Sequence, residues 1–202
     1  ALSSAASDVY KRQGWCDFCI YKEEVQRMND LIKNSKSVDY VKNRVKARRF
    51  KKEDAKEVRN LIVRNFLEIN SRDYGLSAME TLAKVYDEEK VLNVASYAHM
   101  YVFEFEEKIV GTGSSSSFWG SETESILLCI FVLPEFHGKG IGSKIISTLE
   151  QDEFYVRANR IEIPASITAT EFYRKFGYDY KDGVKELDDE RHYRLEKFKE
   201  TV

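Results

Sequence analysis

FVLPEFHGKGIGSKI, residues 131–145, joins an apolar run to the start of a helical repeat through three alternate glycines. Pro134 has no amide hydrogen for a sheet ladder, so it should end the preceding strand. Gly138, Gly140 and Gly142 then fall where a helix begins, with unpaired N–H groups and the positive end of the helix dipole. Glycine adopts positive φ angles and leaves room for an anion. The stretch therefore predicts a strand, a phosphate-binding loop and a helix.

Two familiar phosphate loops do not fit this spacing. A Walker loop needs Ser or Thr after its lysine, whereas Lys139 is followed by Gly140. A dinucleotide fingerprint reads G-x-G-x-x-G near the first strand of its unit, whereas here G-x-G-x-G follows half of the chain. The hypothesis of a nucleotide-dependent oxidoreductase is therefore supported by the glycines alone.

The residues on either side of the glycines predict a parallel pair of strands. ESILLCIFVL at 124–133 is almost wholly apolar, as expected of a strand covered on both faces within a sheet. Ile141, Ile145 and Leu149 recur every four residues and indicate a helix. The pattern then predicts a strand at 159–165 and a helix at 168–177. Successive strand, helix and strand imply parallel pairing.

The rest of the chain predicts more helices and an antiparallel hairpin. Apolar spacings of three and four residues indicate helices at 51–69 and 76–95. Two strands, 100–105 and 108–119, should pair across a short polar turn. Further strand-like pieces lie at 40–50, 178–180 and 192–198. The sum is an α/β (α+β) fold with a mixed central sheet of six to seven strands and helices on both faces.

Composition excludes several classes of protein. The 202 residues include 32 Lys plus Arg against 34 Asp plus Glu, so no basic field favours nucleic acid. Three cysteines are too few for a disulfide framework, and no apolar window is long enough to span a membrane. We expect a cytoplasmic protein with no nucleic-acid or membrane partner.

The first 39 residues are interpreted as an extension that precedes one domain at 40–202. ALSSAASDVYKRQ has neither a signal-peptide pattern nor a helical or strand period, and it resembles a translated library adapter. We expect this first part to be non-native. Lys22 to Ile32 could form a short helix, and Cys16 and Cys19 form a lone C-x-x-C that predicts free thiols rather than a metal site.

Two motifs together resemble the GCN5-related N-acetyltransferase (GNAT) family. IFVLPEFHGKGIGSKII at 130–146 is similar to the family's central motif, and ASITATEFYRKFGY at 165–178 is similar to its later motif. The order and separation of the two also match. One departure is His137, where the family usually has Gln or Arg. The resemblance implies an acyl-CoA N-acyltransferase-like fold for residues 40–202.

The resemblance also implies an acetyl-CoA site without a metal. The pantetheine arm would bond to the backbone between two splayed strands, and loop amides would hold the pyrophosphate. An N–H near Phe131 or Val132 would stabilise the oxyanion. Ser166 matches a position where many relatives place a cofactor-contacting Asn. The full predicted cofactor set is Ile130, Phe131, Val132, His137, Gly138, Lys139, Gly140, Ile141, Gly142, Ser143 and Ser166.

Three residues are predicted to move protons. Tyr173 matches the family's acid, which protonates the departing thiolate. On spacing alone, it would be part of an apolar helix face. Glu124 is the first candidate for the base that deprotonates the amine, and Glu162 is the alternative. Either carboxylate could instead be a solvated residue at a strand end.

We interpret the remaining cysteine and histidine side chains of the domain as structural. Cys129 lies within an apolar strand and is interpreted as a buried small residue rather than a nucleophile. His99 and His192 are treated as structural. The acidic residues of the last connection could attract a cationic amine to an acceptor cleft or could form a solvated loop: Asp182, Glu186, Asp188, Asp189 and Glu190. Three aromatic residues, Trp119, Tyr74 and Tyr97, could line the same cleft or belong to the core.

The sequence thus predicts an acetyl-CoA-dependent N-acetyltransferase that transfers the acetyl group directly to an amine of unidentified nature. The alternative is a non-catalytic acyl-CoA-binding module that keeps the glycine loop. A homodimer is compatible with either.

Overall fold

The computed structural model describes residue 26 and residues 38–199. The expectations for the short helix near Lys22 to Ile32 and for Cys16 and Cys19 lie outside these residues. None of the helices in the described part is long and apolar enough to cross a membrane.

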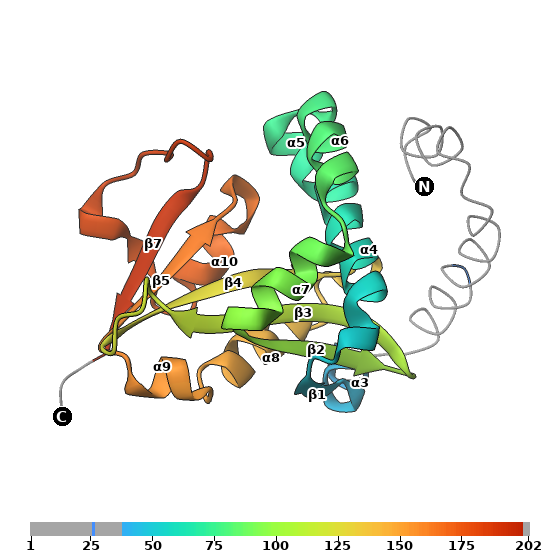
Figure 1. Cartoon of the computed structure of the whole chain (residues 1–202), viewed down its shortest axis with the longest axis horizontal. Coiled ribbons are helices and arrows are strands. Elements are labelled where there is room, and N and C mark those ends of the chain that lie inside the picture. The colour runs from blue at the N-terminus through green and yellow to red at the C-terminus, as the bar shows by residue number, and fades with distance from the viewer. Residues whose placement is uncertain (1–25, 27–37, 200–202) are drawn as a thin grey trace.

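The described residues form one seven-stranded mixed sheet in the order β1-β2-β3-β4-β5-β7-β6 (Figure 1). Strands β4 and β5 are parallel, and every other neighbouring pair is antiparallel. This confirms the predicted mixed sheet of six to seven strands. The strands are β1 Lys46–Arg49, β2 His99–Phe105, β3 Lys108–Ser117, β4 Glu124–Val132, β5 Arg160–Ala165, β6 Asp179–Tyr180 and β7 Tyr193–Phe198.

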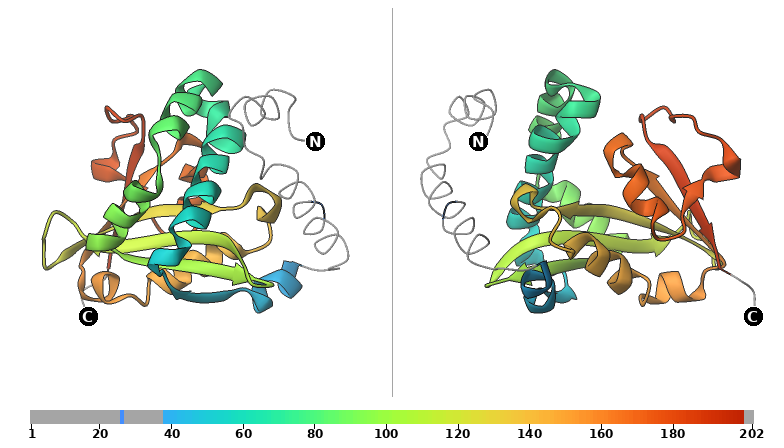
Figure 2. Two further views of the ribbon diagram at one scale, coloured as in Figure 1. Left: turned by 45° about the vertical axis from the view of Figure 1, so that its right-hand side comes forward. Right: turned by 180° about the vertical axis from the view of Figure 1, so that it is seen from behind.

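Helices cover both faces of the sheet, as Figures 1 and 2 show. Helices α4 to α7 lie on one face, and α8 and α9 lie on the other, below the sheet in Figure 1. The helices are α3 Val38–Arg44, α4 Ala55–Asn65, α5 Ser71–Tyr74, α6 Leu76–Val85, α7 Glu88–Tyr97, α8 Ile141–Leu149, α9 Glu153–Arg157 and α10 Thr170–Arg174.

The predicted strand at 40–50 is mostly wrong, because α3 occupies its first part. Val41 and Val45 are both buried, and their separation of four residues suits one face of a helix as well as it suits a strand end. The strand itself covers Lys46–Arg49 and forms the edge of the sheet.

The predicted helix at 76–95 is two helices. It breaks between α6 and α7, where Asp87 accepts a hydrogen bond from the Lys90 N–H at 3.0 Å and so caps α7. Asp87 and the two glutamates after it were the sequence signal for this new helix start. The helix predicted at 51–69 instead continues beyond α4 through a π-helical turn, Phe66–Asn70, into α5.

Two glycines of β3 allow α8 to approach the sheet closely. A Cβ atom on Gly113 would lie 2.6 Å from Ile145 Cγ2 and 3.1 Å from Leu149 Cδ1. A Cβ atom on Gly111 would lie 3.2 Å from Ile145 Cδ1. Ile145 and Leu149 are fully buried. Glycine in a strand interior marks such an approach, and here it sets where α8 and the loop before it lie.

Gly113→Ala should therefore destabilise the protein by about 1–3 kcal/mol, because the added methyl group has no room beneath α8. Denaturant unfolding measures this change. The double variant with Ile145→Ala should lose less stability than the sum of the two single changes, because it restores space. Equal unfolding midpoints for Gly113→Ala and the parent would contradict this packing argument.

Candidate active site

Strands β4 and β5 separate after a short paired end. They pair from Glu124 with Arg160 to Ile126 with Glu162, and the described strands have no further β4–β5 pair beyond this. Past this point β4 stays paired with β3, and β5 stays paired with β7 up to Ala165. The two strands thus form a V whose inner edges carry backbone N–H and C=O groups without a neighbouring strand.

A β-bulge re-aims the backbone of β4 inside this V. Gly113 of β3 lies opposite both Cys129 and Ile130, because the register shifts by one residue there. Cys129 has a φ angle of 52°, in the left-handed region that residues other than glycine seldom adopt. The bulge breaks the regular alternation at the middle of the strand.

The ladder between β3 and β4 decides which peptide groups face the V. The Leu133 N–H donates to the Val110 carbonyl at 2.9 Å. Because bonded and non-bonded pairs alternate along an antiparallel ladder, Phe131 also bonds to β3, whereas the polar groups of Val132 face the V. Of the three predicted backbone contacts, Val132 and the bulge residue Ile130 are favoured, and Phe131 is disfavoured.

The glycine loop presents several backbone N–H groups that have no acceptor among the residues that the structure describes. Gly140 has a φ angle of 77° and is the N-cap of α8. The amides without an acceptor belong to Gly138, Gly140, Ile141, Gly142 and Ser143. They surround the N-terminal end of a nine-residue helix, which attracts an anion.

Two other predicted loop residues use their amides within the turn. The His137 N–H donates to the Pro134 carbonyl, and the Lys139 N–H donates to the Phe136 carbonyl at 3.3 Å. The His137 ring reaches back, and its Nε2 lies 2.9 Å from the Val132 carbonyl oxygen. This contact connects the loop to the end of β4. His137, which stands where the family usually has Gln or Arg, therefore has a structural role.

The three glycines serve different purposes. Gly138 has a φ angle of 73°, and a Cβ atom there would meet nothing within 4 Å. At Gly140 a Cβ atom would lie 3.1 Å from Lys42 Cδ of α3. At Gly142 it would lie 2.9 Å from the Phe172 ring of α10. The expectation that Gly142 makes room for an anion is therefore corrected: its missing side chain makes room for a neighbouring helix.

Tyr173 lies on α10 and is 5% exposed. Burial raises the pKa of its hydroxyl above the ordinary tyrosine range, so the group stays protonated at neutral pH. Within the described part of the chain, no side chain or carbonyl is bonded to this hydroxyl. The adjacent Phe172 ring is 5.2 Å from the Tyr173 ring and also fills the space beside Gly142. Ser166, which precedes α10, is half-buried, and its carbonyl accepts from Thr170.

Both predicted bases lie at the paired end of the V and share one arginine. Arg160 donates to Glu124 at 3.0 Å through Nη1, to Glu196 at 2.7 Å through Nε, and to Glu162 through Nη2. The arginine side chain is 11% exposed. Carboxylates from β4, β5 and β7 are thus joined where these strands come together.

The two carboxylates differ in their surroundings. Glu162 is 2% exposed and also lies 3.2 Å from Lys181 and 3.4 Å from Arg194, so its oxygens are committed to cations. The Glu124 side chain is 36% exposed and is paired with Arg160. These contacts favour Glu124 over Glu162 as the group free to accept a proton, and both roles stay predictions.

Cys129 contacts Tyr86 above the bulge. Burial of the thiol raises the pKa of Cys129 to about 11, and a hydrogen bond from Tyr86 offsets part of that rise. Burial, followed by the neighbouring thiol, raises the pKa of Tyr86. Phe66 of the π-helical turn packs edge-on against Tyr86 and Phe131, at centroid distances of 5.3 and 5.9 Å. Cys129 as a whole is half-buried, whereas the sequence predicted a buried residue.

Contacts from α5 cross the V to the far strands. The Tyr74 hydroxyl donates to the Arg191 carbonyl at 3.1 Å and accepts from the Ile167 N–H at 3.3 Å. Asp73 accepts from the Thr168 N–H at 2.9 Å. Tyr74 is half-buried and packs against the hydrophobic core, and its hydroxyl joins α5 to the segments after β5 and before β7. Trp119 is 92% exposed and Tyr97 is 52% exposed, so neither is a core residue.

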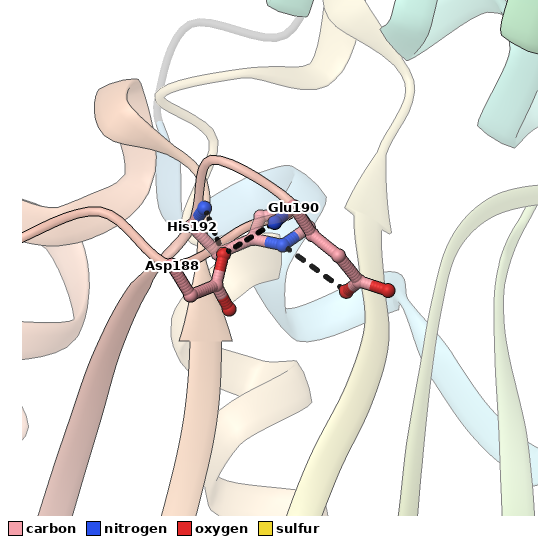
Figure 3. Close-up of side chains that lie close together, drawn as sticks. All are labelled: Asp188, Glu190 and His192. Carbon is pink, nitrogen blue, oxygen red and sulfur yellow. Dashed lines mark hydrogen bonds and ion pairs between the residues drawn. The ribbon is translucent and has the colours of Figure 1, made fainter.

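Asp188, Glu190 and His192 gather in the loop between β6 and β7, as Figure 3 shows. Their possible ligand atoms lie within 4.8 Å of one another. The Asp188 carboxylate, however, accepts from the N–H groups of Glu190 and His192 and from Arg194 Nε at 2.6 Å. Partial burial alone would raise the pKa of Asp188, but these hydrogen bonds outweigh it and lower the pKa. The group holds the loop together, in line with a structural His192.

His99 also has structural partners. Its Nδ1 lies 2.9 Å from Asp152, which is buried and also accepts from the Tyr101 hydroxyl at 2.8 Å. The pair connects β2 to the start of α9, away from the V.

Comparisons with known proteins agree with this geometry. Residues 96–180 match the family model described as an acetyltransferase (GNAT) domain. That segment contains β2 to α10, including both arms of the V and the glycine loop. No curated protein matches the sequence.

Several solved structures share the fold. A PaiA N-acetyltransferase from Thermoplasma acidophilum in complex with coenzyme A has a TM-score of 0.66 at 16% identity, covering 77% of this chain and 99% of that chain. A GCN5-related N-acetyltransferase from Rhodopseudomonas palustris has a TM-score of 0.60 at 21% identity, covering 76% and 94%. Ard1 from Thermoplasma volcanium has a TM-score of 0.57 at 16% identity, covering 77% and 97%.

Cys129 should react slowly with iodoacetamide. With a pKa of about 11, about a thousandth of the thiol is ionised at pH 8, against about a quarter for an ordinary cysteine. In a Cys16→Ser/Cys19→Ser background, alkylation should be about two-hundredfold slower than that of a free thiol. Mass spectrometry of timed samples measures the rate. Tyr86→Phe should slow it further, because the hydrogen bond that lowers the pKa is lost. A rate like that of free cysteine would reopen a nucleophilic role.

Proposed function

Because the chain carries a GNAT acetyltransferase domain, we propose that it moves the acetyl group of acetyl-CoA directly to an amine acceptor. The predicted family, fold class and enzyme class, an acetyl-CoA-dependent N-acetyltransferase, are confirmed by the domain match and the fold. Enzymes of this family use acetyl-CoA as co-substrate. One observation carries the finer proposal: the V between β4 and β5 opens beside a loop in which five amides have no acceptor among the described residues.

The inner edge of β4 suits the pantetheine arm. An extended chain that carries amide groups can bond to an open strand edge as an added strand does. Val132 directs its N–H to that edge next to the bulge residue Ile130, its carbonyl being in contact with His137, and β5 is not paired with β4 from Ile163 onward. A thioester there would have a backbone N–H close to its carbonyl oxygen, which is what stabilises an oxyanion.

The glycine loop suits the diphosphate. Its unbonded amides converge at the N-terminus of α8, where the helix dipole adds a favourable field. Gly138 is exposed and has open space around it, so a phosphate group can reach the backbone. No side-chain cation is required for this contact, although Lys139 lies in the same loop.

Two proton movements complete the proposed reaction. The neutral amine forms the new C–N bond, the C–S bond breaks, and the thiolate takes a proton. The buried and protonated hydroxyl of Tyr173 is the proposed donor. Before the attack, the ammonium form of the acceptor gives a proton to a base, for which Glu124 is the first candidate and Glu162 the second, and the proton that nitrogen loses as the amide forms balances the one that the thiolate takes. An alkylamine has a pKa near 10.4, so such a base is needed at neutral pH.

The acceptor is an amine, and its identity is set by the face between α5 and the β6–β7 loop. The acidic set in that loop includes Asp188, whose oxygens are taken by the loop itself and Arg194. The predicted attraction of a cationic amine therefore rests on the more exposed acids, such as Asp189 and Glu190. A homodimer and a cytoplasmic location stay predictions.

Purified protein should bind acetyl-CoA saturably and release CoA with at least one member of an amine panel, read out by thiol release. Tyr173→Phe should lower kcat by about a hundredfold or more while the Kd for acetyl-CoA changes little, because only the proton donor is lost. Tyr178→Phe is the matched control, since Tyr178 is also buried and no role in the reaction is proposed for it. Binding without turnover across the panel would favour the alternative, a non-catalytic acyl-CoA-binding module.

Substitutions of Glu124 and Glu162 should differ in their effects on the free energy of unfolding and on activity. Glu162→Gln should lower the free energy of unfolding by about 1.5–3 kcal/mol, because Arg160 loses a buried charged partner and keeps only Glu124 and Glu196. Glu124→Gln should cost less than about 1 kcal/mol, because its ion pair is partly exposed. If Glu124 is the base, Glu124→Gln should lower kcat at pH 7 and lose less activity as the pH rises towards the amine pKa. An unchanged kcat would remove Glu124 from the mechanism.

A further inference from the structure

A buried ion pair connects α4 to the turn that leads into the glycine loop. Arg64, in the last turn of α4, has a side chain that is 6% exposed. It pairs with Glu68 through two bonds, Nε to Oε1 at 2.7 Å and Nη2 to Oε2 at 3.1 Å. Its Nη1 lies 3.0 and 2.9 Å from the two carboxylate oxygens of Glu135.

Glu135 lies where the chain leaves β4 and enters the glycine loop. It belongs to the 3₁₀ turn Pro134–Phe136, directly between the end of β4 and the first glycine of the loop. Its side chain is 7% exposed and points back to α4 rather than to solvent. Three residues later, Gly138 offers the first of the unbonded amides. The direction of this side chain therefore bears on how the loop leaves the strand.

The contact between Arg64 and Glu135 is electrostatic as well as steric. Arg64 stands between two carboxylates, those of Glu68 and Glu135, and all three groups are largely buried. Without the guanidinium, two buried carboxylates would lose their shared cation, and one of them sits in the turn that leads into the loop proposed to receive a diphosphate. Glu135 would then have to turn outward or take up a proton, and either change moves the turn.

The same helical segment also reaches the other side of the V. From α4 it continues through the turn Phe66–Asn70 into α5, where Asp73 and Tyr74 bond to residues that follow β5. Arg64 is thus anchored in an element that contacts both the glycine-loop side and the α10 side of the site.

We propose that Arg64 is a positioning residue, which neutralises and holds Glu135 so that the glycine loop presents its amides to the diphosphate of acetyl-CoA. The inference rests on the proposed function for the identity of the ligand. It assigns Arg64 no contact with the ligand itself. Its effect passes through Glu135 and the turn.

Calorimetric titration with acetyl-CoA tests this on four proteins: the parent, Arg64→Met, Arg64→Met/Glu135→Gln and Arg64→Met/Glu68→Gln. Arg64→Met keeps the apolar stem and should raise the Kd at least tenfold. Adding Glu135→Gln should recover most of the affinity, because the neutral side chain needs no cation. Adding Glu68→Gln should recover little, because Glu135 stays unpaired, so this double variant is the matched control.

Hydrogen exchange gives a readout that does not depend on the ligand. The N–H groups of Phe136, His137 and Lys139 are hydrogen bonded within the turn. They should exchange faster in Arg64→Met than in the parent, and near the parental rate once Glu135→Gln is added. If Arg64→Met does not fold, Arg64→Gln replaces it in all three variants, since it also removes the charge but keeps a polar end group.

Several results would overturn the proposal. A parental Kd and unchanged turn exchange in a less stable Arg64→Met protein would show that Arg64 only stabilises the fold. Equal recovery by the two double variants would show that Glu135 has no special part. Failure of the parent to bind acetyl-CoA would instead count against the proposed function, and the exchange of the turn amides would still decide whether Arg64 positions the loop.

Discussion

The separation of β4 from β5 after Ile126 governs the arrangement of the candidate site. Two strands that leave each other expose backbone groups that a continuous sheet would have bonded, and those groups must find water or a ligand. Both arms stay in place because β3 and β7 hold their outer edges, while the bulge at Cys129 and Ile130 turns the inner edge of β4. The open V therefore follows from the pairing of the sheet itself.

Buried ion pairs hold the V at two places. Arg160 joins carboxylates of β4, β5 and β7 at the paired end, where the strands must not separate. Arg64 joins α4 to the turn after β4, where the loop must be aimed. In both places one guanidinium serves two or more carboxylates, a geometry that the planar, multidentate arginine side chain suits better than lysine. Charge thus fixes orientation at points where apolar packing alone would permit several arrangements.

Much of the fold could be predicted because its elements are local patterns. The apolar run of β4, Pro134 and the alternate glycines predict a strand, a turn and a helix, and α8 begins at Ile141 as expected. The misses have physical causes. Val41 and Val45 fit a helix as well as a strand, and only the core decides between them. The break at Asp87 was readable from its capping pattern, but the apolar period on either side of it hid the break.

The strand, glycine loop and helix around Pro134, and the later helix that carries Tyr173, are readable from the amino-acid order, because they depend on residues close together in the chain. Their surroundings are set by long-range packing. The structure shows that Gly142 makes room for Phe172, that Glu124 and Glu162 share Arg160, and that Arg64 reaches Glu135 across 71 residues. Such contacts join segments far apart in the chain, and no local spacing encodes which charge will meet which partner once the core has packed.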